Sequence, residues 1–189
     1  MIFHNVKIFI LTFIMSFTLP SSWGKDTYFA GLEKFRKDFT FKTQDKTIVS
    51  GTRLSKGTIR KKPCVLMLHG FTETKEYFEH FGKHFFKEGF NVFLVNLPDH
   101  GLPGSRSVSS HAAGGFDDLM SFCKSTINKI NKVCGGRPIN IVTHSMGGMS
   151  CVDNYLNGGV HKVDDKFILD PKEAKLAAKK INKVIAGAP

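Results

Sequence analysis

The chain has 189 residues, the length of a single domain, and a hydrophobic fraction of 41% that is ample for one core. Its formal net charge of +11 comes from lysines scattered along the chain, without the basic and aromatic interleaving of nucleic-acid binding proteins, so we expect no nucleic-acid partner. The charge indicates either attraction to anionic surfaces or a lysine-biased composition whose acidic remainder is missing, and we favour the second interpretation.

Residues 1–24 are predicted to be a signal peptide. Lys7 supplies the positive charge of the N-terminal region, and Ile8–Leu19 is largely apolar. Ser22 and Gly24 are small residues at the two positions that a signal peptidase recognises. The apolar run is about a dozen residues, short of the ~20 that a membrane-spanning helix needs. We therefore expect export to the periplasm or medium and a domain over residues 25–189, with an uncleaved membrane anchor as the alternative.

Strands are predicted in the first half of that domain. Residue alternation predicts a pair over Asp38–Thr43 and Thr47–Leu54, joined by a turn. A strand from Cys64 to His69 follows, because a continuous apolar run is typical of a strand covered on both faces of a parallel sheet. Asn91–Asn96 has the same character.

Two helices are predicted between these strands and the next. The first places Phe78, Phe81 and Phe85 on one face at helical spacing, and Gly89 ends it. The second runs from about Gly115 to Cys134 with an apolar stripe. We expect both apolar faces to pack into the core.

The last part of the chain is predicted to hold a short helix over Pro171–Lys180 and a strand over Val184–Pro189. Strands and helices therefore alternate along most of the chain. This order predicts the α/β class, with a mostly parallel sheet and helices on both faces.

Export would permit disulfides among the four cysteines. Cys64 begins a predicted strand and Cys134 follows a predicted helix, so these two are able to pair, but three connectivities are open if all four do. Cys123 and Cys151 are interpreted as small buried apolar residues. Their spacings do not suggest a metal site, and we predict none.

The segment Ile139–Gly148 combines a strand with a sharp turn. An apolar run leads into Thr143-His144-Ser145-Met146-Gly147-Gly148, and helix-compatible sequence follows over Met149–Leu156. This arrangement predicts a nucleophile elbow, in which a tight turn presents the hydroxyl of Ser145. Thr143 stands where the G-x-S-x-G pattern has its first glycine, so the match is partial.

Three landmarks in order carry a resemblance to a known family: His69-Gly70-Phe71, then the loop Asn96–Gly101 with Gly104-Ser105 beyond it, then Thr143–Gly148. Over residues 36–189 the chain resembles the α/β-hydrolase family, in particular its lysophospholipase and monoacylglycerol-lipase-like branch. The resemblance implies the α/β-hydrolase fold, no cofactor and a small-molecule or lipid ester as substrate. Peripheral membrane association is left open.

The resemblance also implies roles for individual residues. Ser145 would be the nucleophile, and the backbone N–H groups of Phe71 and Met146 would form the oxyanion hole. His69 and Gly70, with Thr143, His144, Gly147 and Gly148, belong to the two motifs. His69 is interpreted as structural and not as the catalytic base.

The acid and the histidine that would complete a catalytic triad are not recognised in this chain. The family order is serine, then Asp or Glu, then His, and after Ser145 only His161, Asp164, Asp165 and Asp170 come into question, all before the last predicted strand. The cap region of relatives is also missing. We therefore expect a C-terminally truncated, incomplete domain that is inactive as given, with an unpaired edge at its last strand.

Three functions remain open. The first is an exported serine hydrolase acting on carboxylic esters, and the second is an amide or peptide hydrolase of the iminopeptidase kind. The third is a non-catalytic fragment or binding protein. Epoxide hydrolases and haloalkane dehalogenases of this fold use a carboxylate nucleophile, and Ser145 argues against both.

Overall fold

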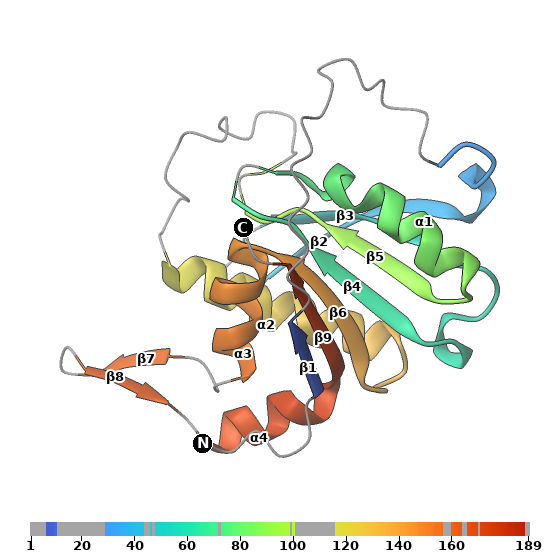
Figure 1. Cartoon of the computed structure of the whole chain (residues 1–189). Coiled ribbons are helices and arrows are strands. Elements are labelled where there is room, and N and C mark those ends of the chain that lie inside the picture. The colour runs from blue at the N-terminus through green and yellow to red at the C-terminus, as the bar shows by residue number, and fades with distance from the viewer. Residues whose placement is uncertain are drawn as a thin grey trace.

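The computed structural model describes residues 7–10, 29–43, 46, 48–71, 73–98, 100, 116–156, 160–163, 166–169 and 171–187. A seven-stranded sheet with the order β1-β9-β6-β4-β5-β3-β2 forms the centre of the described fold (Figure 1). All neighbours are parallel except the pairs β5–β3 and β3–β2. The predicted α/β class with a mostly parallel sheet is therefore confirmed.

The strands of the sheet are β1 (Lys7–Ile10), β2 (Arg36–Lys42), β3 (Ile48–Leu54), β4 (Cys64–Leu68), β5 (Asn91–Val95), β6 (Ile139–His144) and β9 (Ile181–Gly187). The helices are α1 (Glu79–Lys87), α2 (Phe116–Val133), α3 (Asn154–Leu156) and α4 (Pro171–Lys180). Short 3₁₀ turns cover η1 (Glu33–Phe35), η2 (Ile59–Lys61) and η3 (Lys75–Phe78), and a π-helical turn, η4, covers Gly147–Asp153. Among the described residues, no helix has the length and apolar character to cross a membrane.

Each face of the sheet has its own core, because successive side chains of a strand point to opposite faces. On one face Val65 and Met67 of β4 pack with Val92 and Leu94 of β5 under α1. On the other face the intervening residues of these strands pack with α2, α3 and α4, among them Leu66, Leu68, Phe93, Phe122, Ile127, Tyr155 and Ala177. The continuous apolar runs of β4 and β5 are thereby explained, since both of their faces are covered.

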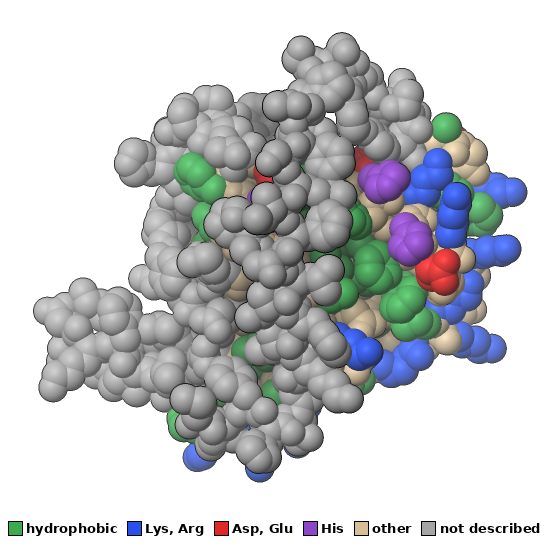
Figure 2. Space-filling view, in the orientation of Figure 1, with side chains coloured by type: hydrophobic (Ala, Val, Ile, Leu, Met, Phe, Trp, Pro, Cys, Tyr) green, Lys and Arg blue, Asp and Glu red, His purple; other side chains and the backbone are tan. Residues whose placement is uncertain are grey.

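The phenylalanine face of α1 differs from the prediction. Phe78 is buried and Phe85 packs on the core, but Phe81 is 44% exposed. The packed face is centred on Gly82, where an added Cβ would lie 3.3 Å from the side chain of Leu94, and Phe81 lies about 100° away from it around the helix. Figure 2 shows basic and histidine side chains with hydrophobic ones on the side of the molecule where Figure 1 places α1.

The end of the chain holds elements that the sequence analysis missed. β9 begins at Ile181, directly after α4 and three residues before the predicted start at Val184. A hairpin of β7 (Val160–Val163) and β8 (Lys166–Leu169) forms a separate two-stranded sheet in a stretch for which no strand was predicted.

The outer edge of β9 was predicted to be unpaired, but in the structure it is paired. Lys7–Ile10 lies beside it as β1, in parallel register with Lys183–Ala186. An edge strand presents a row of free N–H and C=O groups, and the short apolar strand β1 supplies partners for them. The strand therefore comes from the segment that we expect to be a signal peptide.

Two disulfides connect the layers. One joins Cys64 at the start of β4 to Cys134 after α2, with 6.4 Å between the Cα atoms. The other joins Cys123 of α2 to Cys151 of η4, with 5.3 Å between the Cα atoms. The first is the pairing that was left open. Cys123 and Cys151 are buried, as interpreted, but they are also paired, because α2 and η4 pack directly on one another and bring the two side chains together.

His69 joins the carboxyl ends of β4 and β5. Its Nδ1 donates to the carbonyl of Gly70 over 2.7 Å, and its Nε2 accepts the N–H of Leu97 over 3.0 Å. The side chain has no exposed surface, and burial lowers the pKa of His69 to about 4 from its ordinary value of 6.5. The interpretation of His69 as structural agrees with these contacts.

Reduction of the disulfides is expected to destabilise the fold. In the chain-entropy account, a crosslink spanning 70 residues stabilises by about 4 kcal/mol, and one spanning 28 by somewhat less. The unreduced protein in guanidinium should show no titratable thiol, and thermal unfolding should shift to lower temperature after reduction. Free thiols in the unreduced protein would contradict the pairing.

The buried His69 should make stability fall at acid pH. The unfolded chain binds a proton at His69 below about pH 6.5, whereas the folded chain does so only near pH 4. The stability that the neutral His69 contributes to the fold is thus complete above pH 6.5. It is lost as the pH falls toward 4, by at most about 3 kcal/mol of unfolding free energy. His69→Gln should flatten the slope of unfolding free energy against pH in this window. The exposed His84 is the control, and an equal effect of His84→Gln would refute the assignment.

Candidate active site

A sharp turn at Ser145, as the predicted nucleophile elbow requires, lies between β6 and η4. Ser145 follows His144, the last residue of β6, and has a φ of +47°, in the left-handed region that costs a non-glycine residue about 1–2 kcal/mol. Its N–H donates to the carbonyl of Gly187 at the end of β9 over 3.2 Å, and its carbonyl accepts the N–H of Gly148 over 2.9 Å. These bonds hold the strained turn in the strand–turn–helix context that an elbow requires.

Gly147 and Gly148 are each required by a close approach. A Cβ on Gly147 would lie 2.5 Å from the carbonyl oxygen of Leu68, at the end of β4. A Cβ on Gly148 would lie 2.6 Å from the hydroxyl oxygen of Thr143. The departure from the G-x-S-x-G pattern at Thr143 is therefore accommodated by a glycine on the facing side of the same turn.

The two motifs meet although they are far apart in the sequence. A Cβ on Gly70 would lie 3.3 Å from the Cβ of Ser145 and 3.0 Å from Nδ1 of His144. The loop after β4 thus lies against the elbow, where the resemblance puts the oxyanion hole. Among the hydrogen bonds that described residues make outside the helices and strands, none uses the N–H of Phe71 or of Met146. Both predicted donors are uncommitted in the described structure.

His100 holds the loop that contains Phe71. It is buried, its Nε2 is in contact with the carbonyl oxygen of Phe71, and its Nδ1 lies 2.6 Å from the carbonyl oxygen of Pro98. Its ring centroid is 5.1 Å from that of His69. Both ring nitrogens face backbone carbonyls, so His100 links the loops after β4 and β5. The other predicted landmarks of this loop, Asp99, Gly101, Gly104 and Ser105, lie outside the described residues.

The remaining acid and base candidates are not brought to the elbow by described contacts. His161 lies in β7, opposite Ile168 of β8 in the separate hairpin. Asp164, Asp165 and Asp170 lie outside the described residues. In the part of the chain that the structure describes, no group of histidine, cysteine and carboxylate side chains is suited to hold a metal ion.

Glu73 is a site residue that the sequence analysis missed. Its Oε2 accepts the N–H of Gly70 over 2.7 Å, and its Oε1 lies 2.9 Å from Nδ1 of His144. The ring of Tyr77 stacks on His144 with centroids 5.3 Å apart. Burial raises the pKa of Tyr77, and the charge of Glu73 adds to this. The available signal was a carboxylate three residues after Gly70, a spacing at which side chains reach back to a backbone N–H.

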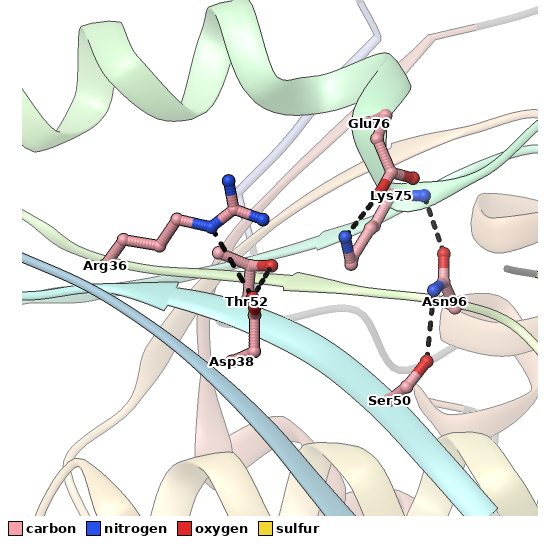
Figure 3. A network of polar contacts seen from close by, with 7 residues as sticks. All are labelled: Arg36, Asp38, Ser50, Thr52, Lys75, Glu76 and Asn96. Atoms are coloured by element: carbon pink, nitrogen blue, oxygen red, sulfur yellow. Dashed lines mark hydrogen bonds and ion pairs between the residues drawn. The ribbon is translucent and has the colours of Figure 1, made fainter. Parts of the chain in front are cut away.

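The segment after Glu73 is anchored by a second polar network (Figure 3). Asn96, after β5, accepts the backbone N–H of Lys75 over 2.8 Å and donates to the hydroxyl of Ser50 over 3.0 Å. The Lys75 ammonium pairs with Glu76. Asn96 therefore connects the start of η3 to β3 and β5, and it limits where Glu73 is able to lie.

Comparison with known proteins agrees with this geometry. A family profile described as "Serine aminopeptidase, S33" matches residues 59–169. The YitV protein of Bacillus subtilis (strain 168), named as a candidate esterase, is 31% identical over 98 residues, which are 48% of this chain and 38% of YitV. The chain thus spans well under half of the length of that relative.

Solved structures of low sequence identity share the fold. Epoxide hydrolase A from Mycobacterium thermoresistibile has a TM-score of 0.54 at 14% identity, with 80% of this chain and 38% of that chain covered. The thioesterase domain from the curacin biosynthetic pathway has a TM-score of 0.54 at 16% identity, with 80% and 45% covered. An esterase of Pyrococcus furiosus has a TM-score of 0.51 at 23% identity, with 65% and 45% covered.

These likenesses show the fold and leave the chemistry to the site. The sheet, its helices and the elbow form part of an α/β-hydrolase fold. The profile match extends over more than half of the chain and includes both the His69-Gly70-Phe71 loop and the Ser145 elbow. The chain belongs to the serine aminopeptidase S33 family of α/β-hydrolases.

Proposed function

We propose that the chain is part of a serine hydrolase that cleaves carboxylic esters through an acyl-enzyme at Ser145. The observation that carries the proposal is the strained turn at Ser145, with a φ of +47°, packed against Gly70. The N–H groups of Phe71 and Met146, which bond to no described residue, flank this contact in the sequence. A serine on such a turn has its hydroxyl in position for attack and has donors nearby for the oxyanion.

The reaction would proceed in two stages. The Oγ of Ser145 attacks the carbonyl carbon of the ester while a base takes the hydroxyl proton, and the oxyanion accepts hydrogen bonds from the Phe71 and Met146 amides. The tetrahedral intermediate then expels the alcohol, which takes up that proton. Water attacks the acyl-enzyme, releases the acid and restores the serine. Each oxyanion donor of this kind contributes about 3–4 kcal/mol to transition-state stabilisation.

The base is proposed to lie outside the described residues. His69 has both ring nitrogens in backbone hydrogen bonds, and both nitrogens of His100 face backbone carbonyls. His144 is paired with Glu73 through Nδ1. None of these three histidines is committed to Ser145 by a described contact. No described contact therefore identifies the base, and the expectation from the sequence that this chain turns over ester very slowly stays a prediction.

A lipid-derived ester is the substrate class that we favour, as in the lysophospholipase and monoacylglycerol-lipase-like branch. The side chain of Phe71 is 47% exposed although the residue lies in the loop that packs on the elbow. An exposed aromatic ring beside the nucleophile offers apolar surface to an acyl chain. Peripheral association with anionic membranes stays an open alternative, although a lysine-biased composition is the interpretation of the +11 charge that we favour.

An amide or peptide hydrolase is the second candidate, and the description of the family as serine aminopeptidases favours it. Both reactions use the same nucleophile and oxyanion hole, so they differ in the leaving group. A panel of matched nitrophenyl esters and amino-acid anilides separates them by kcat/KM. The third possibility, a binding protein, would hydrolyse neither.

Export is proposed from the N-terminal segment and the disulfides. Disulfides persist in oxidising compartments and are rare in the cytosol, and the described cysteines form two of them. Cleavage after Gly24 would remove β1 from the sheet, because that strand lies within residues 1–24. N-terminal sequencing of the secreted protein tests both statements.

Ser145 should react selectively with a fluorophosphonate probe. The phosphonylated serine mimics the acylation transition state, and the Phe71 and Met146 amides would stabilise its negative oxygen. Intact-protein mass spectrometry should find one adduct, lost in Ser145→Ala and kept in the matched control Ser125→Ala on α2. An adduct that survives Ser145→Ala would refute the assignment of the nucleophile.

The 189-residue chain should hydrolyse short-chain nitrophenyl esters no more than a few-fold faster than its Ser145→Ala variant. The expected loss from a missing triad base is on the order of 10⁴–10⁶ in kcat. Circular dichroism of both proteins establishes that they are folded to the same extent. Robust turnover that depends on Ser145 would mean that the base lies within the chain, and His100 and His161 would be substituted first.

A further inference from the structure

We propose that Glu73 is the positioning residue of the oxyanion hole, holding its two halves at a fixed separation. One half is the loop after β4, which carries the Phe71 N–H, and the other is the elbow, which carries the Met146 N–H. The inference rests on the proposed function, because an oxyanion hole matters only if Ser145 is acylated. Glu73 acts through the backbone and through His144, and it does not touch the reacting atoms.

Glu73 contacts both halves with one carboxylate. Its Oε2 accepts the N–H of Gly70 over 2.7 Å, and its Oε1 lies 2.9 Å from Nδ1 of His144. Gly70 directly precedes Phe71, and His144 directly precedes Ser145. The two residues that the carboxylate contacts therefore directly precede one oxyanion donor, Phe71, and the proposed nucleophile, Ser145.

The loop needs such a contact because Gly70 is conformationally free. A glycine in a loop readily populates several backbone conformations, so the peptide units on both sides of Gly70 have to be held in place. His69 orients the unit that Gly70 shares with Phe71, because its Nδ1 donates to the Gly70 carbonyl over 2.7 Å. The Gly70 N–H is held by Glu73, and the Phe71 carbonyl is held by His100. With the N–H and the carbonyl of Gly70 and the carbonyl of Phe71 all held, the Phe71 N–H has little freedom of direction.

The elbow side is equally constrained. The imidazole of His144 has the Glu73 carboxylate at Nδ1 and the ring of Tyr77 stacked on its face. The Glu73 side chain is 17% exposed and that of His144 is 25% exposed, so water competes weakly for the contact. Hydrogen bonds to a charged acceptor are about twice as strong as neutral ones, which suits a contact that must hold two loops together.

The backbone segment that carries Glu73 is itself anchored. The Lys75 N–H, two residues on, is bound by Asn96, which in turn binds Ser50 of β3 (Figure 3). The carboxylate is thus presented from a segment tied to the sheet. A movement of Glu73 would have to break this anchor as well as its own contacts.

The first test measures the rate of Ser145 phosphonylation by a fluorophosphonate. Removal of one oxyanion donor costs about 10²–10³ in rate, so misplacement of a donor should cost less, about 10-fold in Glu73→Gln and more in Glu73→Ala. The loss should lie in the maximal rate, with the half-saturating probe concentration unchanged. Glu76→Gln, which removes a carboxylate from the same segment, is the matched control and should react like the wild type.

The second variant pair tests whether Glu73 and His144 act as one unit. If they do, Glu73→Gln combined with His144→Gln should be no slower than the slower single variant. Independent, multiplying losses would overturn the proposal. So would a Glu73→Gln protein that reacts at the wild-type rate, or a Glu76→Gln protein that loses as much.

A measurement that does not depend on the reaction of Ser145 separates this proposal from the proposed function. Hydrogen exchange read by NMR should be faster in Glu73→Ala at Gly70 and also at Ser145, whose N–H is bound to the Gly187 carbonyl at the elbow, whereas a role confined to the loop would affect Gly70 alone. If wild-type Ser145 does not react because the chain lacks its base, the exchange data alone decide the role of Glu73. Unchanged exchange at Ser145 would overturn the positioning role.

Discussion

The close approach of the elbow to the end of β4 is the contact on which the rest of the site depends. Position 147 has no room for a side chain, because a Cβ there would lie 2.5 Å from the Leu68 carbonyl oxygen and 2.8 Å from that of His69. This approach brings the loop after β4 within van der Waals distance of Ser145. The absence of a side chain at position 147 thus allows two segments far apart in the sequence to pack directly on one another.

The polar residues at this end of the sheet serve mainly to hold backbone. His69 binds the chain after β5, His100 binds Phe71 and Pro98, and Asn96 binds Lys75 and Ser50. The carboxyl ends of parallel strands are the usual place for a ligand site in an open α/β sheet, and loops there must be fixed without help from the sheet ladder. Side-chain hydrogen bonds perform that task here, which explains why three buried polar residues lie at this end of the sheet.

Much of the fold could be predicted from local patterns. The apolar runs of β4 and β5, the amphipathic stripe of α2 and the short helix α4 were recognised because their periodicity reflects the side that each element buries. The elbow could be predicted because its constraint is local: a serine with glycines at fixed offsets between a strand and a helix. The prediction was wrong where packing overrides periodicity. Helical spacing puts Phe81 on the apolar face, but α1 contacts β5 through Gly82, and this orientation leaves Phe81 exposed.

The sequence by itself thus determined the order of strands and helices, the elbow serine and the family, because each depends on residues that are neighbours along the chain. Only the tertiary structure decided which partners meet. The pairing of β1 with β9, the disulfide between Cys123 and Cys151, and the reach of Glu73 from Gly70 to His144 all join distant segments. No local pattern encodes such a contact, because its strength depends on distances that the packing of the sheet and its helices sets.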